Sequence, residues 1–211
     1  TLKEDDRHVS ALPLRTSAAW FMYAALGSCV LLAVSNHLTQ NIASVPFLWV
    51  VPLALYLITF IICFDHPRWY IRAIYMPILG ISLIAMAWMI DSLELQWAAP
   101  IFAIGLFASC MFCHGELARL RPPPAHLTLF YLAISIGGAV GALLIAVIAP
   151  TVLNGYFEMH GVLVVMAVLL PVRTWRTGML LRVAAALTLA GVSGLVGTAI
   201  HSYTEGVREM E

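Results

Sequence analysis

Seven long apolar runs constrain what this chain can fold into more than any other feature. They cover residues 17–35, 46–64, 71–90, 97–113, 127–149, 156–172 and 179–200. A helix needs about 20 mostly apolar residues to cross the hydrocarbon core of a bilayer. The runs are longer than the strands of a membrane β-barrel, and their side chains do not alternate as such strands require. We therefore predict an all-α, polytopic transmembrane helical bundle of about seven spans.

The composition agrees with this prediction and excludes several classes of protein. Hydrophobic residues make up 62% of the chain and charged residues 10%, against about 25% charged residues in an ordinary soluble domain. The mean hydropathy is +0.92. The net charge is zero, so the chain lacks the basic surface that binds nucleic acid. These values exclude a soluble enzyme and a nucleic-acid partner, and they make the lipid bilayer the first expected partner.

The basic residues predict an orientation. Ten of the eleven Lys and Arg residues lie before the first run or in every second connection, and only Arg208 falls on the other side. The ten are Lys3, Arg7, Arg15, Arg68, Arg72, Arg119, Arg121, Arg173, Arg176 and Arg182. Connections rich in Lys and Arg stay in the cytoplasm. We therefore expect a cytoplasmic N-terminal segment over 1–16, a transmembrane domain over 17–200 and an external tail over 201–211, in a bacterial inner membrane.

The first residue is Thr rather than Met, and the chain does not open with the pattern of a signal peptide. We therefore expect a processed chain or part of a longer one. Four cysteines in a chain of this size do not indicate a disulfide framework.

An uncharged polar cluster follows the first run and is the first candidate site. Its candidate substrate-binding residues are Asn36, His37, Thr39, Gln40 and Asn41. Apolar residues flank the cluster closely, which favours a broken or re-entrant segment that lines a cavity on the outer side. The simpler alternative is a capped helix end followed by a polar turn.

Glu158 is a further substrate-binding candidate, because it is the only acidic residue in or beside the sixth run. An ionisable side chain costs free energy inside a membrane and therefore needs an explanation. A deep position would make Glu158 a cation or proton site, whereas a position at the outer interface would leave it hydrated.

A second group lies where the fourth run ends, at the predicted cytoplasmic side. It contains His114, Glu116, Arg119 and Arg121. If the helix continues, Glu116 and Arg119 stand three residues apart on one face and can pair at the membrane edge. The prolines that follow Arg121 must leave the helix. We interpret this group as an inner gate or a docking surface.

Cys110, Cys113 and His114 formally match the C-x-x-C-H signature for covalent haem. The predicted orientation places them in the cytoplasm, whereas haem attachment occurs on the outer face. Cysteines inside an apolar helix more often pack as small hydrophobic side chains. The second Cys/His pair of a zinc site is also missing. We therefore expect no cofactor and no metal, and a haem-binding subunit stays a third hypothesis.

Glycines in the fifth and seventh runs predict close helix packing. Gly137 and Gly141 form a G-x-x-x-G motif, and Gly191 and Gly194 repeat at a spacing of three. Small residues allow helix backbones to approach closely in lipid. A hinge in a moving helix is the alternative interpretation.

Two stretches resemble a known family. The first is residues 36–57, from Asn36 through the proline-flanked segment to Leu57. The second contains residues 113–119, Arg121-Pro122, residues 126–128 and 130–132, Ser135, Gly137, Gly138 and Gly141. Both resemble the membrane region of bacterial fused integral-membrane spermidine-synthase-like proteins, over roughly residues 20 to 172. That region is described as transporter-like, of major-facilitator type, and a soluble synthase-like domain follows it.

The resemblance implies a transporter-like membrane architecture but no reaction, because the synthase-like domain is not among these residues. Our leading hypothesis is an inner-membrane protein that binds or moves a small polar or cationic solute. The alternative is a non-catalytic structural or accessory subunit of a larger membrane complex. Its partners would be other membrane subunits or a synthase-like domain.

Overall fold

A computed structural model describes residues 14–41, 49–90, 95–152, 158–174 and 179–208, and the described segments fold into helices without strands. Four helical stretches are long and apolar enough to cross a membrane, and three shorter apolar helices lie among them. The four are Leu14–Thr39, Arg72–Met89, Gln96–Arg119 and Pro124–Val152, and the three are Val50–Asp65, Glu158–Pro171 and Ala185–Thr198. The all-helical class and a membrane-compatible character are therefore established for the described residues.

The elements follow the order of the apolar runs. The larger helices are α1 (Leu14–Asn41), α2 (Val50–Asp65), α3 (Arg72–Met89), α4 (Leu95–Arg119), α5 (Leu127–Leu143), α7 (Glu158–Thr174) and α8 (Met179–Arg208). Short 3₁₀ turns, η2 (Pro67–Trp69) and η3 (Pro124–His126), precede α3 and α5. A π-helix, η4 (Leu144–Ile148), and the short α6 (Ala149–Val152) continue α5 without a break.

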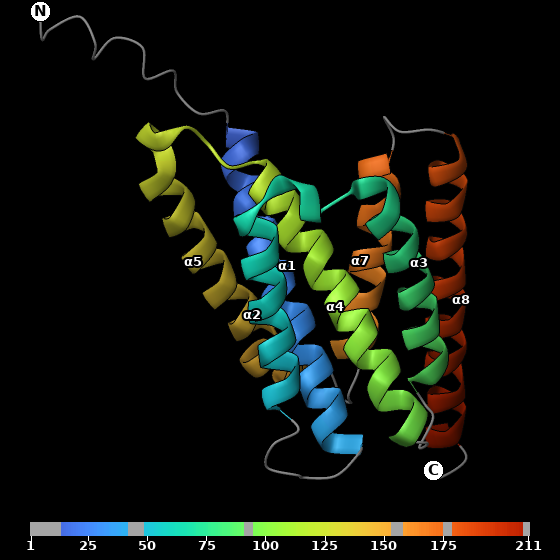
Figure 1. The fold of residues 1–211 in the computed structure, drawn as a ribbon. Coiled ribbons are helices and arrows are strands. Elements are labelled where there is room, and N and C mark those ends of the chain that lie inside the picture. The colour runs from blue at the N-terminus through green and yellow to red at the C-terminus, as the bar shows by residue number, and fades with distance from the viewer. Residues whose placement is uncertain (1–13, 42–48, 91–94, 153–157, 175–178, 209–211) are drawn as a thin grey trace, which may run out of the picture.

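Helices α1 and α4 form the centre of the bundle (Figure 1). Helix α5 packs along α1, and α2 and α3 pack along α4. Helix α7 contacts α1 and α3, and α8 lies outside α3 and α7 at the edge of the bundle. The central position of α4 explains why the side chains near its end are almost completely buried.

Helices α1 and α5 pack along a seam where the close approach of their backbones requires glycine at two positions of α5. A Cβ atom at Gly137 would lie 2.5 Å from the carbonyl oxygen of Phe21, and one at Gly141 would lie even closer to that of Ala25. The Cys29 thiol donates to the Gly141 carbonyl across the same seam. Gly194 of α8 does not serve such close packing, because a Cβ atom at this position would meet no atom within 4 Å.

The position of Trp20 near the start of the first run predicts an interfacial anchor, and this prediction is wrong. The ring is fully buried and packs edge-to-face on Phe130, with ring centroids 5.1 Å apart. Its Nε1 donates to the carbonyl of Leu120 at 2.9 Å, which ties α1 to the chain just after α4. Trp69 and Trp97 are more than half exposed and fit the anchor interpretation.

The polar cluster after the first run does not break the helix within the described residues, and residues 42–48, which would form the rest of a re-entrant segment, lie outside them. Helix α1 continues through it to Asn41. The hydroxyl of Ser35 donates to the carbonyl of Leu31 at 2.7 Å, and that of Thr39 donates to the carbonyl of Ser35 at 2.9 Å. Short polar side chains can bond to their own helix in this way, so they do not have to end it. At the other end of the chain, α8 extends to Arg208, into the segment that we expected to be an external tail.

Candidate functional site

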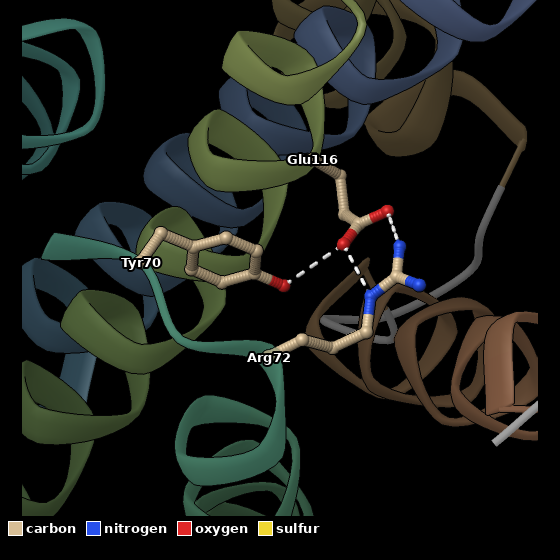
Figure 2. A network of polar contacts seen from close by, with 3 residues as sticks. All are labelled: Tyr70, Arg72 and Glu116. Carbon is tan, nitrogen blue, oxygen red and sulfur yellow. Dashed lines mark hydrogen bonds and ion pairs between the residues drawn. The ribbon is translucent and has the colours of Figure 1, made fainter. Parts of the chain in front are cut away.

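A buried carboxylate at the end of α4 organises the candidate site (Figure 2). Glu116 is 1% exposed, and the guanidinium group of Arg72 binds its carboxylate through two nitrogens. The Arg72 Nε donates to Glu116 Oε1 at 2.8 Å, and Nη2 pairs with Oε2. The Tyr70 hydroxyl donates to the same Oε1 at 3.1 Å. Such a bidentate pair is among the stronger hydrogen-bonding arrangements in proteins, because both partners are charged and the geometry matches.

The connection between α2 and α3 positions both donors. His66 ends α2 in an extended conformation, and its Nδ1 accepts from the backbone N–H of Arg68. Proline at the first position of η2 suits the turn because proline has a fixed φ and no N–H to satisfy. The chain then leaves η2 in an extended conformation, so that Tyr70 precedes α3 and Arg72 begins it.

Gly115 lets Tyr70 reach the carboxylate. A Cβ atom at Gly115 would collide with the Tyr70 ring, so only glycine permits the aromatic ring to lie against α4 at this point. The ring also stacks on Tyr75, with centroids 5.6 Å apart. Burial raises the pKa of the Tyr70 phenol well above its usual range, and the negative charge of Glu116 raises it further. Tyr70 therefore acts as a hydrogen-bond donor at any physiological pH.

A cavity of about 540 Å³ with mixed polar and apolar walls adjoins this network between the ends of α2 and α4. Its volume falls in the range of about 300–1,000 Å³ that is typical of small-ligand sites. The cavity shares Tyr70 and Gly115 with the network, and Asp65, Arg119 and Arg121 supply its charges. Apolar and small side chains complete the wall, namely Cys63, Phe64, Pro67 and Ala118. The cavity can therefore hold a small molecule that has both polar groups and an apolar part.

The structure brings together most of the residues predicted for the inner group. Helix α4 does continue to Arg119, as the pairing hypothesis required. However, the ion-pair partner that the structure gives Glu116 is Arg72 rather than Arg119. Arg119 and Arg121 are exposed and line the adjoining cavity instead. Glu116 is therefore a structural anchor beside the cavity, and two other guanidinium groups lie in the cavity wall.

His114, the fourth member of the inner group, is buried deeper between α1, α2 and α4. Thr59 donates its hydroxyl proton to the Tyr56 carbonyl at 2.8 Å, so its oxygen can only accept at the 3.1 Å contact with His114 Nδ1. His114 then carries its proton on Nδ1. Its Nε2 faces Gly27, where an added Cβ would lie 3.6 Å away, and has no hydrogen-bond partner in the described part of the chain.

The cysteines of the C-x-x-C-H pattern lie in the same packed interface. Cys110 and Cys113 are fully buried in α4, and His114 is 1% exposed. A Cβ at Gly27 of α1 would lie 3.8 Å from the Cβ of Cys113. A porphyrin attached here would have to displace α1, so the residues present do not fit a covalent haem. Among the described residues, three or more His, Cys, Asp or Glu side chains do not gather as metal ligands.

The outer candidates lie on other elements and do not join this site. The His37 ring packs at a tilt against Phe102 of α4, with centroids 4.4 Å apart, and Asn36 and Thr39 lie in the same last turns of α1. Gln40 and Asn41 belong to α1, but their side chains lie outside the described residues. Glu158 stands in the first turn of α7.

Three partners of the predicted site residues were not predicted from the sequence. Tyr70 and Arg72 bind Glu116, and Thr59 contacts His114. Arg72 is separated from Glu116 by 44 residues, and Tyr70 by 46. A signal was nonetheless present, since a single carboxylate at the end of an apolar helix needs a cation. Arg72 begins the neighbouring helix on the same predicted side.

Comparison of the chain with protein-family models, with curated proteins and with solved structures finds no match.

Proposed function

We propose that this chain is a multi-pass protein of the bacterial inner membrane that binds or moves a small polar solute through its cytoplasmic end. In this proposal α2, α7 and α8 complete a set of seven spans with the four longer helices, and the N-terminus is cytoplasmic. The start of α1, the η2 turn, the end of α4 and the start of α8 all lie at the upper end of the bundle in Figure 1. Arg15, Arg68, Arg119 and Arg182 lie in these segments, and such a concentration supports a cytoplasmic location.

The observation that carries the proposal is the 540 Å³ cavity at this end, with Arg119 and Arg121 in its wall. Two guanidinium groups favour a carboxylate or phosphate and oppose a polycation. Asp65 offers a partner for an amino group, and Tyr70 offers an aromatic face. We therefore propose a small zwitterion or organic anion as the solute at this cavity. A cationic solute, which the family resemblance favours, fits the uncharged outer end of α1 better.

Uptake into proteoliposomes tests this function. The purified chain is reconstituted, and the uptake of radiolabelled spermidine, glutamate and succinate is compared, together with their binding in detergent. We expect binding of glutamate or succinate to exceed that of spermidine, and the Arg119→Gln/Arg121→Gln double variant to lose it. Arg68→Gln is the matched control, because Arg68 is exposed at the same end but does not line the cavity. Absence of both uptake and binding by a folded protein would overturn the proposal.

The orientation is tested separately with reporter fusions. A reporter placed after Arg121 should be active in the cytoplasm, and one placed in the segment between α1 and α2 should be active in the periplasm. A periplasmic readout after Arg121 contradicts the proposed topology.

A second function, an accessory subunit of a membrane complex, is favoured by the outer faces of the bundle. Only 17% of the residues in the most apolar stretch of Pro124–Val152 are buried. Gly194 and Gly197 of α8 face open space. Purification in mild detergent should then give a partner at fixed stoichiometry that is lost in Gly194→Leu. A monomer that retains solute binding counts against this alternative.

A further inference from the structure

An elongated groove between α1, η4 and α7 is separate from the cytoplasmic cavity. It has a volume of about 360 Å³, and its walls are apolar except for Glu158. Phe21 and Cys29 mark its extent along α1, and Leu169 marks its far end on α7. A volume of this size is large enough for a ligand and is far more than a packing defect.

Two local features keep the groove open. Leu144 and Ile145 in its wall belong to the π-helix, where the wider backbone turn interrupts the regular surface of the α5 region. Such π segments are rare and occur frequently at functional sites. Gly161 lines the groove from α7, and a Cβ atom built on it would meet nothing within 4 Å. The space is therefore not occupied by side chains of the described residues.

The groove opens on an apolar surface. Met22, Leu144 and Val165 belong to its wall and are 53%, 39% and 49% exposed. In the proposed membrane topology this surface faces lipid, so hydrocarbon rather than water is available to fill the groove. From Glu158 to Leu169 the wall follows eleven residues of α7, about 16 Å at ~1.5 Å per residue. That length is close to one leaflet of the hydrocarbon core, about 15 Å.

Glu158 lines the groove at the start of α7 and is the one carboxylate among its described wall residues. It lies in the first turn of α7. Within the described residues it has no ion-pair or hydrogen-bond partner, whereas Glu116 is held by Arg72 and Tyr70. An apolar channel with one anionic group in its wall complements an alkyl chain that carries a cationic head.

We propose that this groove holds one acyl chain of a membrane lipid whose headgroup bears an amine, with the ammonium group beside Glu158. The site lies apart from the cytoplasmic cavity and goes beyond the proposed solute function. It predicts a preference for phosphatidylethanolamine over an anionic lipid such as phosphatidylglycerol with the same chains.

Native mass spectrometry of the purified full chain tests the proposal. The protein in dodecyl maltoside is titrated with phosphatidylethanolamine or phosphatidylglycerol, and the retained lipid is counted. We expect one phosphatidylethanolamine per chain, retained about threefold better than phosphatidylglycerol, which corresponds to one partly exposed ion pair. Glu158→Gln should abolish the preference and keep the chain bound. Gly161→Phe should fill the groove and lower retention of both lipids at least about tenfold.

Gly194→Phe is the matched control, because Gly194 also faces open space but lies outside the groove. It should leave retention unchanged, and thermal unfolding of both phenylalanine variants shows that they fold. Equal retention of the two lipids by the wild-type chain would overturn the headgroup assignment. Unchanged retention in Gly161→Phe would overturn the groove as the lipid site. A dimer that only Gly161→Phe dissociates would identify a second copy of the chain as the occupant and also overturn the proposal.

Discussion

Glu116 and Glu158 both lie near the ends of apolar helices, yet their surroundings differ. Glu116 lies in the last turns of α4, is almost completely buried and is held by Arg72 and Tyr70. Glu158 lies in the first turn of α7, is half-buried and has no ion-pair or hydrogen-bond partner among the described residues. A buried carboxylate whose charge and hydrogen bonds are satisfied by neighbouring side chains has a structural role. A partly exposed carboxylate that the protein leaves unpaired is available to a ligand.

The largest effect is expected from removing the cation that neutralises Glu116. Arg72→Ala leaves a buried carboxylate without its charge partner, which costs about 3 kcal/mol. This figure is the low end of the usual range because the Arg72 side chain is 25% exposed. Reversible unfolding in mixed detergent micelles measures the free energy. Arg68→Ala serves as the control and should change it little. A loss below about 1 kcal/mol in Arg72→Ala would contradict the structural role of the pair.

Removing the charge of Glu116 itself should cost less than removing Arg72. In Glu116→Gln no buried charge remains alone, since Arg72 can turn toward solvent, and the loss should be about 1.5 kcal/mol. The double variant Arg72→Ala/Glu116→Gln should therefore be more stable than Arg72→Ala alone. A double-mutant cycle measures this coupling, and simple additivity of the two losses would show that the residues do not interact.

Tyr70→Phe should have a smaller effect that depends on pH. The variant loses one hydrogen bond to a charged group, about 1.5 kcal/mol or less because Arg72 still satisfies the carboxylate. The pKa of Tyr70 is raised in the folded protein, so the unfolded chain releases this proton first as the pH rises above about 10. The hydrogen bond therefore stabilises the protein fully below that pH and progressively less above it. The gap between wild type and Tyr70→Phe should narrow from pH 9 to pH 11, and a constant gap would contradict this assignment.

The smallest effect is expected at Glu158. Glu158→Gln removes no contact in the described structure, so the free energy of unfolding in lipid-free detergent should change by less than about 0.5 kcal/mol. Comparison with Glu116→Gln under the same conditions tests the contrast between the two glutamates directly. A loss at Glu158 as large as that at Glu116 would show that it too is a structural residue.

The helical class could be predicted from the sequence because each long apolar run corresponds to one of the larger helices. Each expected run contains one major helix, and the boundaries differ mainly where polar residues continue a helix. Residues Ser35 and Thr39 looked like a break because hydroxyl groups are usually found outside apolar helices. Their bonds to the carbonyls of Leu31 and Ser35 remove that conflict without ending α1.

Contacts between distant helices could not be predicted in the same way. Arg119 was the nearest cation to Glu116 along the helix, but the crossing of α3 and α4 brings Arg72 to the carboxylate instead. Sequence spacing also made Gly141 and Gly194 look equivalent. The neighbouring backbone of α1 makes Gly141 indispensable, whereas Gly194 faces open space. Both outcomes depend on packing geometry, which no local pattern encodes.

The π-helix after α5 holds one residue more than an α-helical path would use over the same stretch. Deleting a single residue from Leu144–Ile148 would restore ordinary α-helical winding, and α6 would keep its orientation relative to α5 because the π turn already accommodates the extra residue. The α1–α5 seam at Gly137 lies before this point and would keep its register. This segment is therefore where the bundle can absorb a change in chain length, and homologous chains that are one residue shorter should have their gap here.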